Sequence, residues 1–186
     1  MIAGINCKTI SVGDEQYIGN PKLTTSVAKS FANMFSAGIM YVDSAIFNSG
    51  VIETASGHVE ANNEQNISAG ILDFQSNTGA TVFNGADVNI YGAYASQMPD
   101  DENHLTIDAA TFVPTITVND GRVNFSGAPK PASFIDSVID FFNARNAEVS
   151  IANNIYSLGL CAPGNVNLIG GEINATGGLS SADGLP

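Results

Sequence analysis

The sequence has no tryptophan, few charged side chains and very few basic ones. Charged residues make up 13% of the chain, whereas an ordinary soluble domain has roughly 25%. Six basic residues stand against eighteen acidic ones, so the net charge is −12. A chain without a basic surface lacks the cations that release counterions from a nucleic acid. We therefore expect no nucleic-acid partner, and the same charge disfavours binding to an anionic membrane surface.

Cysteine and histidine are equally scarce, with two of each. Cys7 and Cys161 are far apart and lack metal-ligand spacing, which predicts free thiols. The first residues contain no basic segment followed by a long apolar run, so we predict no signal peptide and no transmembrane segment. No Gly-x-Ser-x-Gly motif or phosphate-binding loop occurs. From the residues alone we expect no catalytic set, no metal centre and no cofactor.

What the chain does contain is a repeated octet rich in Asn and Gly. Residues 83–90 read Phe-Asn-Gly-Ala-Asp-Val-Asn-Ile, and residues 118–125 read Val-Asn-Asp-Gly-Arg-Val-Asn-Phe. Each consists of an apolar residue, Asn, a Gly-containing turn and an apolar-polar-apolar strand. Further copies begin at Phe47, Ile67, Phe142 and Leu168. The octet predicts an all-β fold built of stacked coils.

The polar residue near the end of each octet is predicted to point outward, because alternate residues of a strand face opposite sides. These residues are Glu53, Asp73, Asn89, Asn124, Ser150 and Asn174. Stacked in register, they would form one polar face, which is our candidate face for a glycan or a protein partner. The asparagines at the turns are predicted to form a second, hydrogen-bonded ladder. They are Asn48, Asn84, Asn119 and Asn143.

The copies begin 16 to 35 residues apart, which we interpret as coils of about 20 to 26 residues with variable loops. Before them, Asn20 and Pro21 are typical of a helix start. Apolar residues then recur with helical spacing, and Gly38 is a plausible stop. We therefore predict an amphipathic helix over about 21–37.

These patterns divide the chain into an N-terminal segment with the helix (1–40), a stacked β-region (41–178) and a flexible tail (179–186). Residues 133–142 fit either a helix or two short strands, and their β-branched content favours strands. A cluster of acidic residues lies in a predicted loop: Asp100, Asp101 and Glu102. It is a candidate cation-binding loop or acid/base pair. A solvated loop is the favoured interpretation.

The octet copies over roughly residues 40–178 resemble the right-handed parallel β-helix. The resemblance implies about six coils whose apolar positions stack above one another. It also gives the predicted helix a role, because the open end of such a stack exposes a sheet edge that a helix can cover.

Proteins of this architecture include pectate-lyase-like polysaccharide enzymes and bacteriophage tailspikes, fibres and decoration proteins. The low-charge texture rich in Asn, Gly and Ser resembles the phage group. That resemblance implies a structural, non-enzymatic virion protein, made in the host cytoplasm and associated with other virion proteins. It further implies a homotrimer that contacts host-surface polysaccharide. The alternative is an enzyme or lectin that acts on such a polysaccharide.

Overall fold

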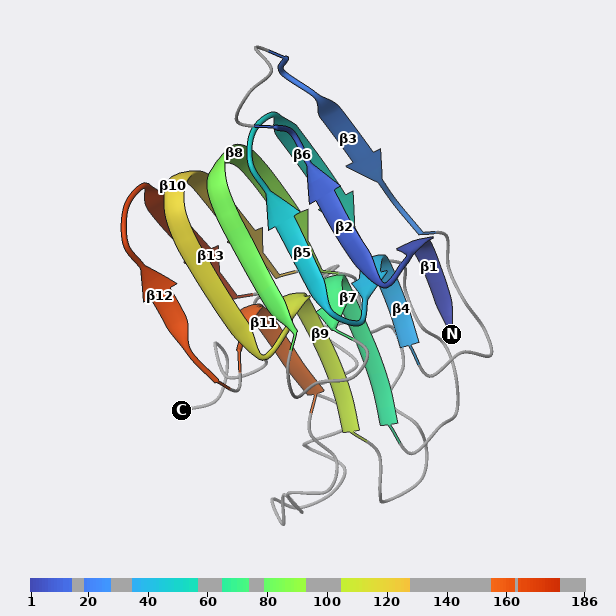
Figure 1. The fold of residues 1–186 in the computed structure, drawn as a ribbon. Helices are drawn as coiled ribbons and strands as arrows, with labels where there is room; N and C mark the ends of the chain where they lie inside the picture. Colours follow the sequence, from blue (N-terminus) through green and yellow to red (C-terminus); the bar gives the residue numbers. More distant parts are fainter. Residues whose placement is uncertain are drawn as a thin grey trace, which may run out of the picture.

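The structure is a computed structural model that describes residues 1–14, 19–27, 35–56, 65–73, 79–92, 105–127, 155–162 and 164–177. Within these segments every regular element is a β-strand. All of the strand pairs are parallel. The strands form two sheets that run along a common stack (Figure 1). The all-β prediction and the stacking of parallel coils are confirmed for this part of the chain.

The first sheet has five strands in the order β1-β4-β7-β9-β11. Their bounds are β1 Ile2–Asn6, β4 Phe35–Tyr41, β7 Gln65–Asp73, β9 Leu105–Phe112 and β11 Ile155–Cys161. Both faces of β4 are buried. Such a strand reads in sequence as a nearly continuous apolar run.

The second sheet has eight strands and two arms that meet at a bend. The first arm contains β2 Thr9–Val12, β5 Ser44–Phe47 and β12 Val166–Leu168. The second arm contains β3 Lys22–Thr25, β6 Val51–Ala55 and β13 Glu172–Thr176. Two long strands, β8 Ala80–Tyr91 and β10 Thr115–Ser126, run through both arms.

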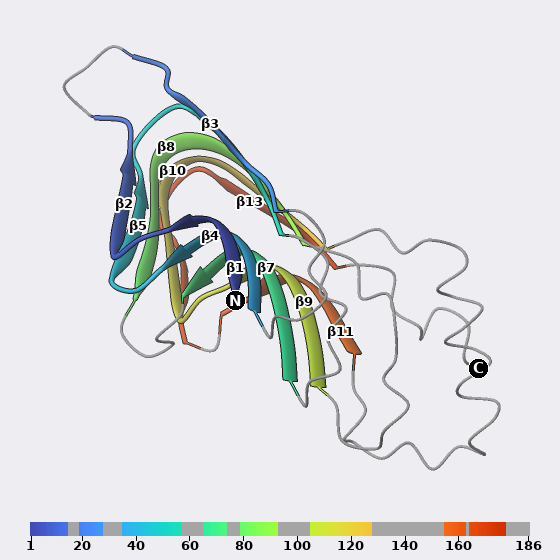
Figure 2. The same ribbon diagram turned by 90° about the vertical axis from the view of Figure 1, so that its right-hand side faces the viewer.

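Each coil therefore has three sides, visible along the stack in Figure 2. The chain passes through the five-stranded sheet, then the first arm and then the second arm. In the described part of the chain this happens five times, in coils formed by β1–β3, β4–β6, β7–β8, β9–β10 and β11–β13. We number these coils from first to fifth.

The bend between the two arms is made at glycines. Gly50, Gly121 and Gly171 have φ angles of +106°, +91° and +75°. Residues with a Cβ rarely adopt this left-handed conformation, whereas glycine does so without steric cost. The octet's turn glycines thus have the role that the sequence predicts for them.

The core lies inside the coils and is formed by columns of inward-facing side chains. One column follows the first arm: Val12, Phe47, Phe83, Val118 and Leu168. Another follows the second arm: Leu23, Ile52, Val88, Val123 and Ile173. In the three middle coils these side chains are fully buried. Burial of aliphatic and aromatic surface of this kind contributes about 25 cal/mol per Å².

The octet alignment is confirmed for the four copies that begin at Phe47, Phe83, Val118 and Leu168, which stack in register. The copy that begins at Ile67 is misaligned, because it lies in β7 of the five-stranded sheet. Its glycine, Gly70, makes no turn. A Cβ there would meet Ile90 and the carbonyl oxygen of Ala110. Glycine at this position therefore permits these segments of the chain to lie close together. The copy at Phe142 lies outside the described residues.

The expected coil length of 20 to 26 residues is wrong. Hydrogen bonds between side chains of neighbouring coils join residues 29 to 40 positions apart, and 50 positions apart between the fourth and fifth coils. The error has a physical cause. Each coil contains a strand of the five-stranded sheet, and these strands lack the octet's alternation because both of their faces meet apolar groups. The same error produced six expected coils, against five in the described segments.

The helix predicted over about 21–37 is also wrong where the structure describes it. Lys22–Thr25 is β3, and Phe35 begins β4. Leu23 occupies the inward position above Ile52, and the Thr25 hydroxyl donates a hydrogen bond to Thr54 Oγ1 over 2.7 Å. Pairing with β6 outweighs the local helical spacing. Residues 28–34 lie outside the described residues.

Candidate functional site: the polar face of the second arm

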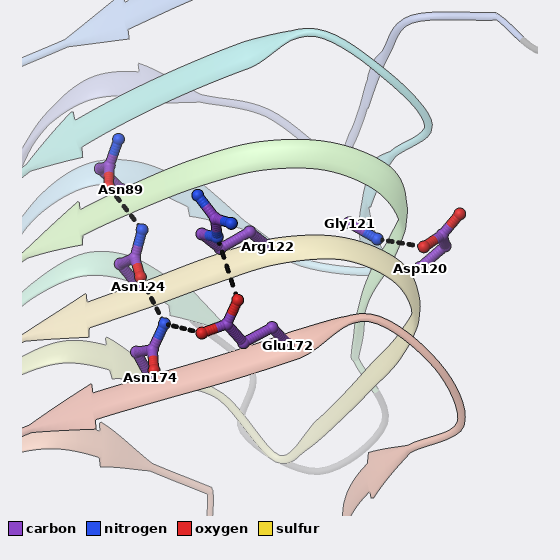
Figure 3. A network of polar contacts seen from close by, with 7 residues as sticks. All are labelled: Asn89, Asp120, Gly121, Arg122, Asn124, Glu172 and Asn174. Atoms are coloured by element: carbon purple, nitrogen blue, oxygen red, sulfur yellow. Dashed lines mark hydrogen bonds and ion pairs between the residues drawn. The ribbon is translucent and has the colours of Figure 1, made fainter.

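A polar surface lies on the outer side of the second arm, and part of it is shown in Figure 3. We call it the polar face and define it by the outward residues of β6, β8, β10 and β13. They are Glu53, Asp87, Asn89, Arg122, Asn124, Glu172 and Asn174. Strand alternation places them outward, because the residues between them fill the inward column.

A ladder of side-chain amides runs along this face. Asn124 Nδ2 donates to Asn89 Oδ1 over 2.9 Å, and Asn174 Nδ2 donates to Asn124 Oδ1 over 3.0 Å (Figure 3). Glu53 occupies the same column beside Asn89. Parallel strands in register hold identical side chains close enough to bond to one another. The predicted polar face is thus present for Glu53, Asn89, Asn124 and Asn174.

Beside the ladder, Arg122 Nε donates a hydrogen bond to Glu172 Oε2 over 3.1 Å. Asn174 Nδ2 also donates to Glu172 Oε1 over 2.9 Å. The hydrogen bond from Asn174, and then the bond and positive charge of Arg122, hold the pKa of the Glu172 carboxyl below its ordinary value. The pair is exposed to solvent, so its contribution to stability is small.

A second amide ladder follows the turn between the arms. Asn84 Nδ2 donates to Asn48 Oδ1 over 2.8 Å, and Asn119 Nδ2 donates to Asn84 Oδ1 over 2.7 Å. At the other end, Asn48 Nδ2 donates to the carbonyl oxygen of Gly13 over 3.1 Å. The ladder predicted from the sequence is confirmed for these three asparagines. Asn143 lies outside the described residues.

Asn84→Ala is expected to lower the free energy of unfolding by about 1–3 kcal/mol, because it removes two hydrogen bonds, one donated to Asn48 and one accepted from Asn119. Urea denaturation measures the change. Asn167→Ala is the matched control, since Asn167 is exposed and makes a single bond of 3.3 Å to Thr117. Its cost should stay within about 0.5 kcal/mol. Equal costs for the two variants would contradict a structural role for the ladder.

Asp73 is the one predicted face residue that the structure places elsewhere. Its side chain is 2% exposed and lies in the interior, at the end of β7. The prediction failed because the octet alignment at Ile67 put Asp73 in the wrong sheet. Ser150 and the acidic loop residues Asp100, Asp101 and Glu102 lie outside the described residues.

A buried polar cluster lies near Asp73 and was not among the predicted sites. The hydroxyls of Tyr41 and Thr81 form a hydrogen bond of 2.8 Å, and both residues are fully buried. Burial raises the pKa of the Tyr41 phenol well above its ordinary value, and the negative charge of Asp73 raises it further. The signal in the sequence is an aspartate that directly follows the apolar Ile71 and Leu72.

Tyr41→Phe is expected to change how stability depends on alkaline pH. The folded-state pKa of Tyr41 lies above the ordinary value of 10.0. The stabilisation from the neutral phenol is therefore complete below about pH 10 and is lost as the pH rises through the folded-state pKa. Above about pH 10 the free energy of unfolding of the wild type should therefore fall more steeply with pH than that of Tyr41→Phe. At pH 7 the substitution is expected to lower the free energy of unfolding by about 1 kcal/mol.

Urea denaturation between pH 7 and about pH 11 tests this prediction. Tyr91→Phe is the control, because it removes the same hydroxyl at a position that is 40% exposed. Parallel pH profiles for wild type and Tyr41→Phe would contradict the assignment.

The polar face offers amide groups and a few carboxylates for hydrogen bonding, and its amides are already paired along the stack. Among the described residues, no group of three His, Cys, Asp or Glu side chains is arranged to hold a metal ion. Across the same segments, no helix has the length and apolar content needed to span a bilayer. The amides and carboxylates of this face can donate and accept hydrogen bonds to a ligand.

These features define a parallel β-solenoid with an amide-laddered face. In comparisons with known proteins the chain matches no family model, no curated protein and no solved structure. Its class therefore rests on its own geometry.

Proposed function

We propose that this chain is a structural, non-enzymatic virion protein of a bacteriophage: a capsid decoration protein, a fibre or a tailspike subunit. In this proposal the solenoid is right-handed, assembles as a homotrimer and contacts other virion proteins. The observation that supports it is the pair of amide ladders. Hydrogen bonds between half-buried and exposed side chains along the stack stiffen the solenoid, which suits a mechanical part.

The trimer is tested by sedimentation equilibrium or light scattering at micromolar concentration. The expected mass is three times the 19.3 kDa of one chain. A stable monomer at that concentration would remove the trimer from the proposal. The virion location is tested separately, by mass spectrometry of purified particles of the phage that encodes the chain. Absence of the chain from intact particles would overturn it.

Contact with a host polysaccharide is the second candidate function, and the outward amides favour it because they can bond to sugar hydroxyls. Two of these, Asn124 and Asn174, lie next to each other on the polar face. Binding to a panel of capsular polysaccharides and lipopolysaccharides, measured by glycan array, is expected for wild type. Asn124→Leu should weaken that binding, whereas Asn167→Leu on the first arm should leave it unchanged.

The enzymatic alternative makes a different prediction, namely release of reducing ends or unsaturated sugars from the same panel. It loses one candidate, because Asp73 is buried. A purely structural protein is expected to leave every polysaccharide at its original size. Cleavage of any of them would favour the enzyme.

A further inference from the structure

The fifth coil ends the stack with apolar side chains that face solvent. Val166 and Leu168 of β12 are 46% and 56% exposed. They occupy inward positions, because they pair with Ile116 and Val118 of β10, which are fully buried. The same positions are thus core in the fourth coil and surface in the fifth. We call β12 and β13 the C-terminal edge.

The opposite end of the second sheet is formed by β2 and β3, which we call the N-terminal edge. Its inward residues are Ile10, Val12 and Leu23, and they pack against the core from one side only. They are partly exposed, whereas their partners in the second coil are fully buried. Those partners are Ala45, Phe47 and Ile52.

The two edges are complementary in direction. Every strand pair of the described stack is parallel, so the backbone donors and acceptors of the C-terminal edge point along the stack away from β10. Those of the N-terminal edge point in the opposite direction, away from β5 and β6. A second molecule in the same orientation would continue both ladders. Exposed sheet edges of this kind are templates for pairing with another chain.

The charges also fit this arrangement. One outward column of the second arm runs Lys22, Val51, Asp87, Arg122 and Glu172. Its last three members alternate in sign, and Arg122 contacts Glu172. In a head-to-tail contact the next residue after Glu172 would be Lys22 of the second copy, which continues the alternation. In the neighbouring column Asn174 would meet Thr24.

We propose that the C-terminal edge binds the N-terminal edge of a second copy of this chain, head to tail, with the inward columns continued across the junction. The contact uses two different surfaces, so it does not close on itself and extends into a row of molecules. The proposal goes beyond the proposed function and does not depend on it. A homotrimer buries surfaces on the sides of the solenoid, whereas this contact buries its ends.

A disulfide across the junction provides the sharpest test. One column of the five-stranded sheet runs Asn6, Met40, Leu72, Phe112 and Cys161. In a head-to-tail contact, Cys161 would therefore lie opposite Asn6 of the second copy. Neighbouring strands are about 4.8 Å apart, which lies within the Cα separations that a disulfide bridges.

We expect Asn6→Cys, made in a Cys7→Ser background, to form dimers and higher oligomers on a non-reducing gel after mild oxidation. The matched control, Asn6→Cys with Cys161→Ser, should stay monomeric. Peptide mapping of mixed light and heavy-isotope chains identifies the linkage. A bond between position 6 and Cys161 of different chains supports the proposal. A bond within one chain, a bond between two Cys161 residues, or no bond overturns it.

A second experiment avoids cysteine. Leu168→Lys places a charge on the C-terminal edge. At concentrations where the wild type forms rows, it is expected to lower the weight-average mass measured by sedimentation equilibrium at least twofold. Tyr91→Lys is the control, since Tyr91 is 40% exposed but lies in the third coil. Far-ultraviolet circular dichroism checks that both variants are folded. Equal masses for the two variants would contradict the proposal.

The charge column is tested by Lys22→Glu, which should reduce association more strongly at 50 mM than at 500 mM salt, because salt screens exposed charges. Lys8→Glu makes the same change of net charge in the first coil, outside the column. If Lys8→Glu reduces association equally, the alternating column has no role.

Trimers without the disulfide linkage would overturn this inference and leave the proposed homotrimer intact. The disulfide linkage without trimers would support this inference and remove the homotrimer from the proposed function.

Discussion

Phe83→Ala is expected to lower the free energy of unfolding by about 3–5 kcal/mol, the range for removing a large aromatic side chain from a packed core. Phe83 is fully buried in the third of the five described coils. Its ring stacks on Phe47, with centroids 5.2 Å apart and an angle of 12°. It also meets Phe125 edge-on at 6.3 Å. The variant loses contacts with the coils on both sides.

Chemical denaturation, followed by circular dichroism, measures this effect. Tyr91→Ala is the control, because it also removes an aromatic ring from β8 but at a position that is 40% exposed. Its cost is expected to stay within about 0.5 kcal/mol. Phe83→Leu should fall between the two, since leucine fills part of the cavity. A cost for Phe83→Ala no larger than that of Tyr91→Ala would contradict the assignment of this column as the core.

Gly38→Val is expected to cost about 3 kcal/mol, at the upper end of the usual range for overpacking. Gly38 lies opposite Gly70, because the residues on either side of it pair with Ala69 and Ile71. A Cβ on Gly38 would lie 2.8 Å from the carbonyl oxygen of Ala55 and 2.9 Å from that of Gly70. Both are backbone atoms, one in β6 of the second arm and one in the neighbouring strand β7, so neither can move aside as a side chain can.

The matched control is Gly19→Val, because a Cβ at Gly19 would meet nothing within 4 Å. Its effect should stay within about 0.5 kcal/mol. Adding Thr54→Ala to Gly38→Val removes the hydroxyl that a Cβ would strike but leaves both carbonyl groups in place. We therefore expect only partial recovery. Full recovery would show that the side chain, and not the backbone approach, limits the size of residue 38.

The sequence predicted the second arm well because its two faces differ. Alternation of residues such as Val123, Asn124 and Phe125 indicates a strand with one buried side and one side that faces solvent. The turn asparagines add a residue type whose side chain bonds to its own copy in the next coil. Fold class, stacking, the turn ladder and the position of the outward polar column followed from these two signals.

The five-stranded sheet was missed for the converse reason. Its outward residues, such as Met40 and Leu72, are as apolar and as buried as its inward ones, so no alternation is visible. Glycines there were misinterpreted as well. The local pattern predicts a helix stop at Gly38 and a turn at Gly70, whereas both glycines permit close contact between the sheets. Such contacts join residues that are distant in the sequence, and a local pattern does not contain them.

The candidate face was predicted for its column of Glu53 and three asparagines, but Asp87, Arg122 and Glu172 beside that column were missed. Asp73 was misplaced together with its strand. Neither Tyr41 nor Thr81 carries a local signal of burial, because their partnership depends on two strands 40 residues apart. The helix predicted in place of the first coil has the same cause, namely contacts between residues distant in the sequence. In β3 a short alternating segment, Leu23 to Thr25, overlaps helical spacing, and only its pairing with β6 distinguishes the two.

The coil length also determines how this chain reaches its fold. Neighbours in the ladders are 35, 36 or 50 residues apart, so each ladder must close a long loop before its hydrogen bonds form. Chains dominated by such non-local pairing fold slowly, in milliseconds to seconds. Lengthening a coil from 35 to 50 residues adds only about 0.3 kcal/mol of closure entropy. We therefore expect the first pair of stacked coils to form slowly and later coils to add faster, because they meet a surface already in place.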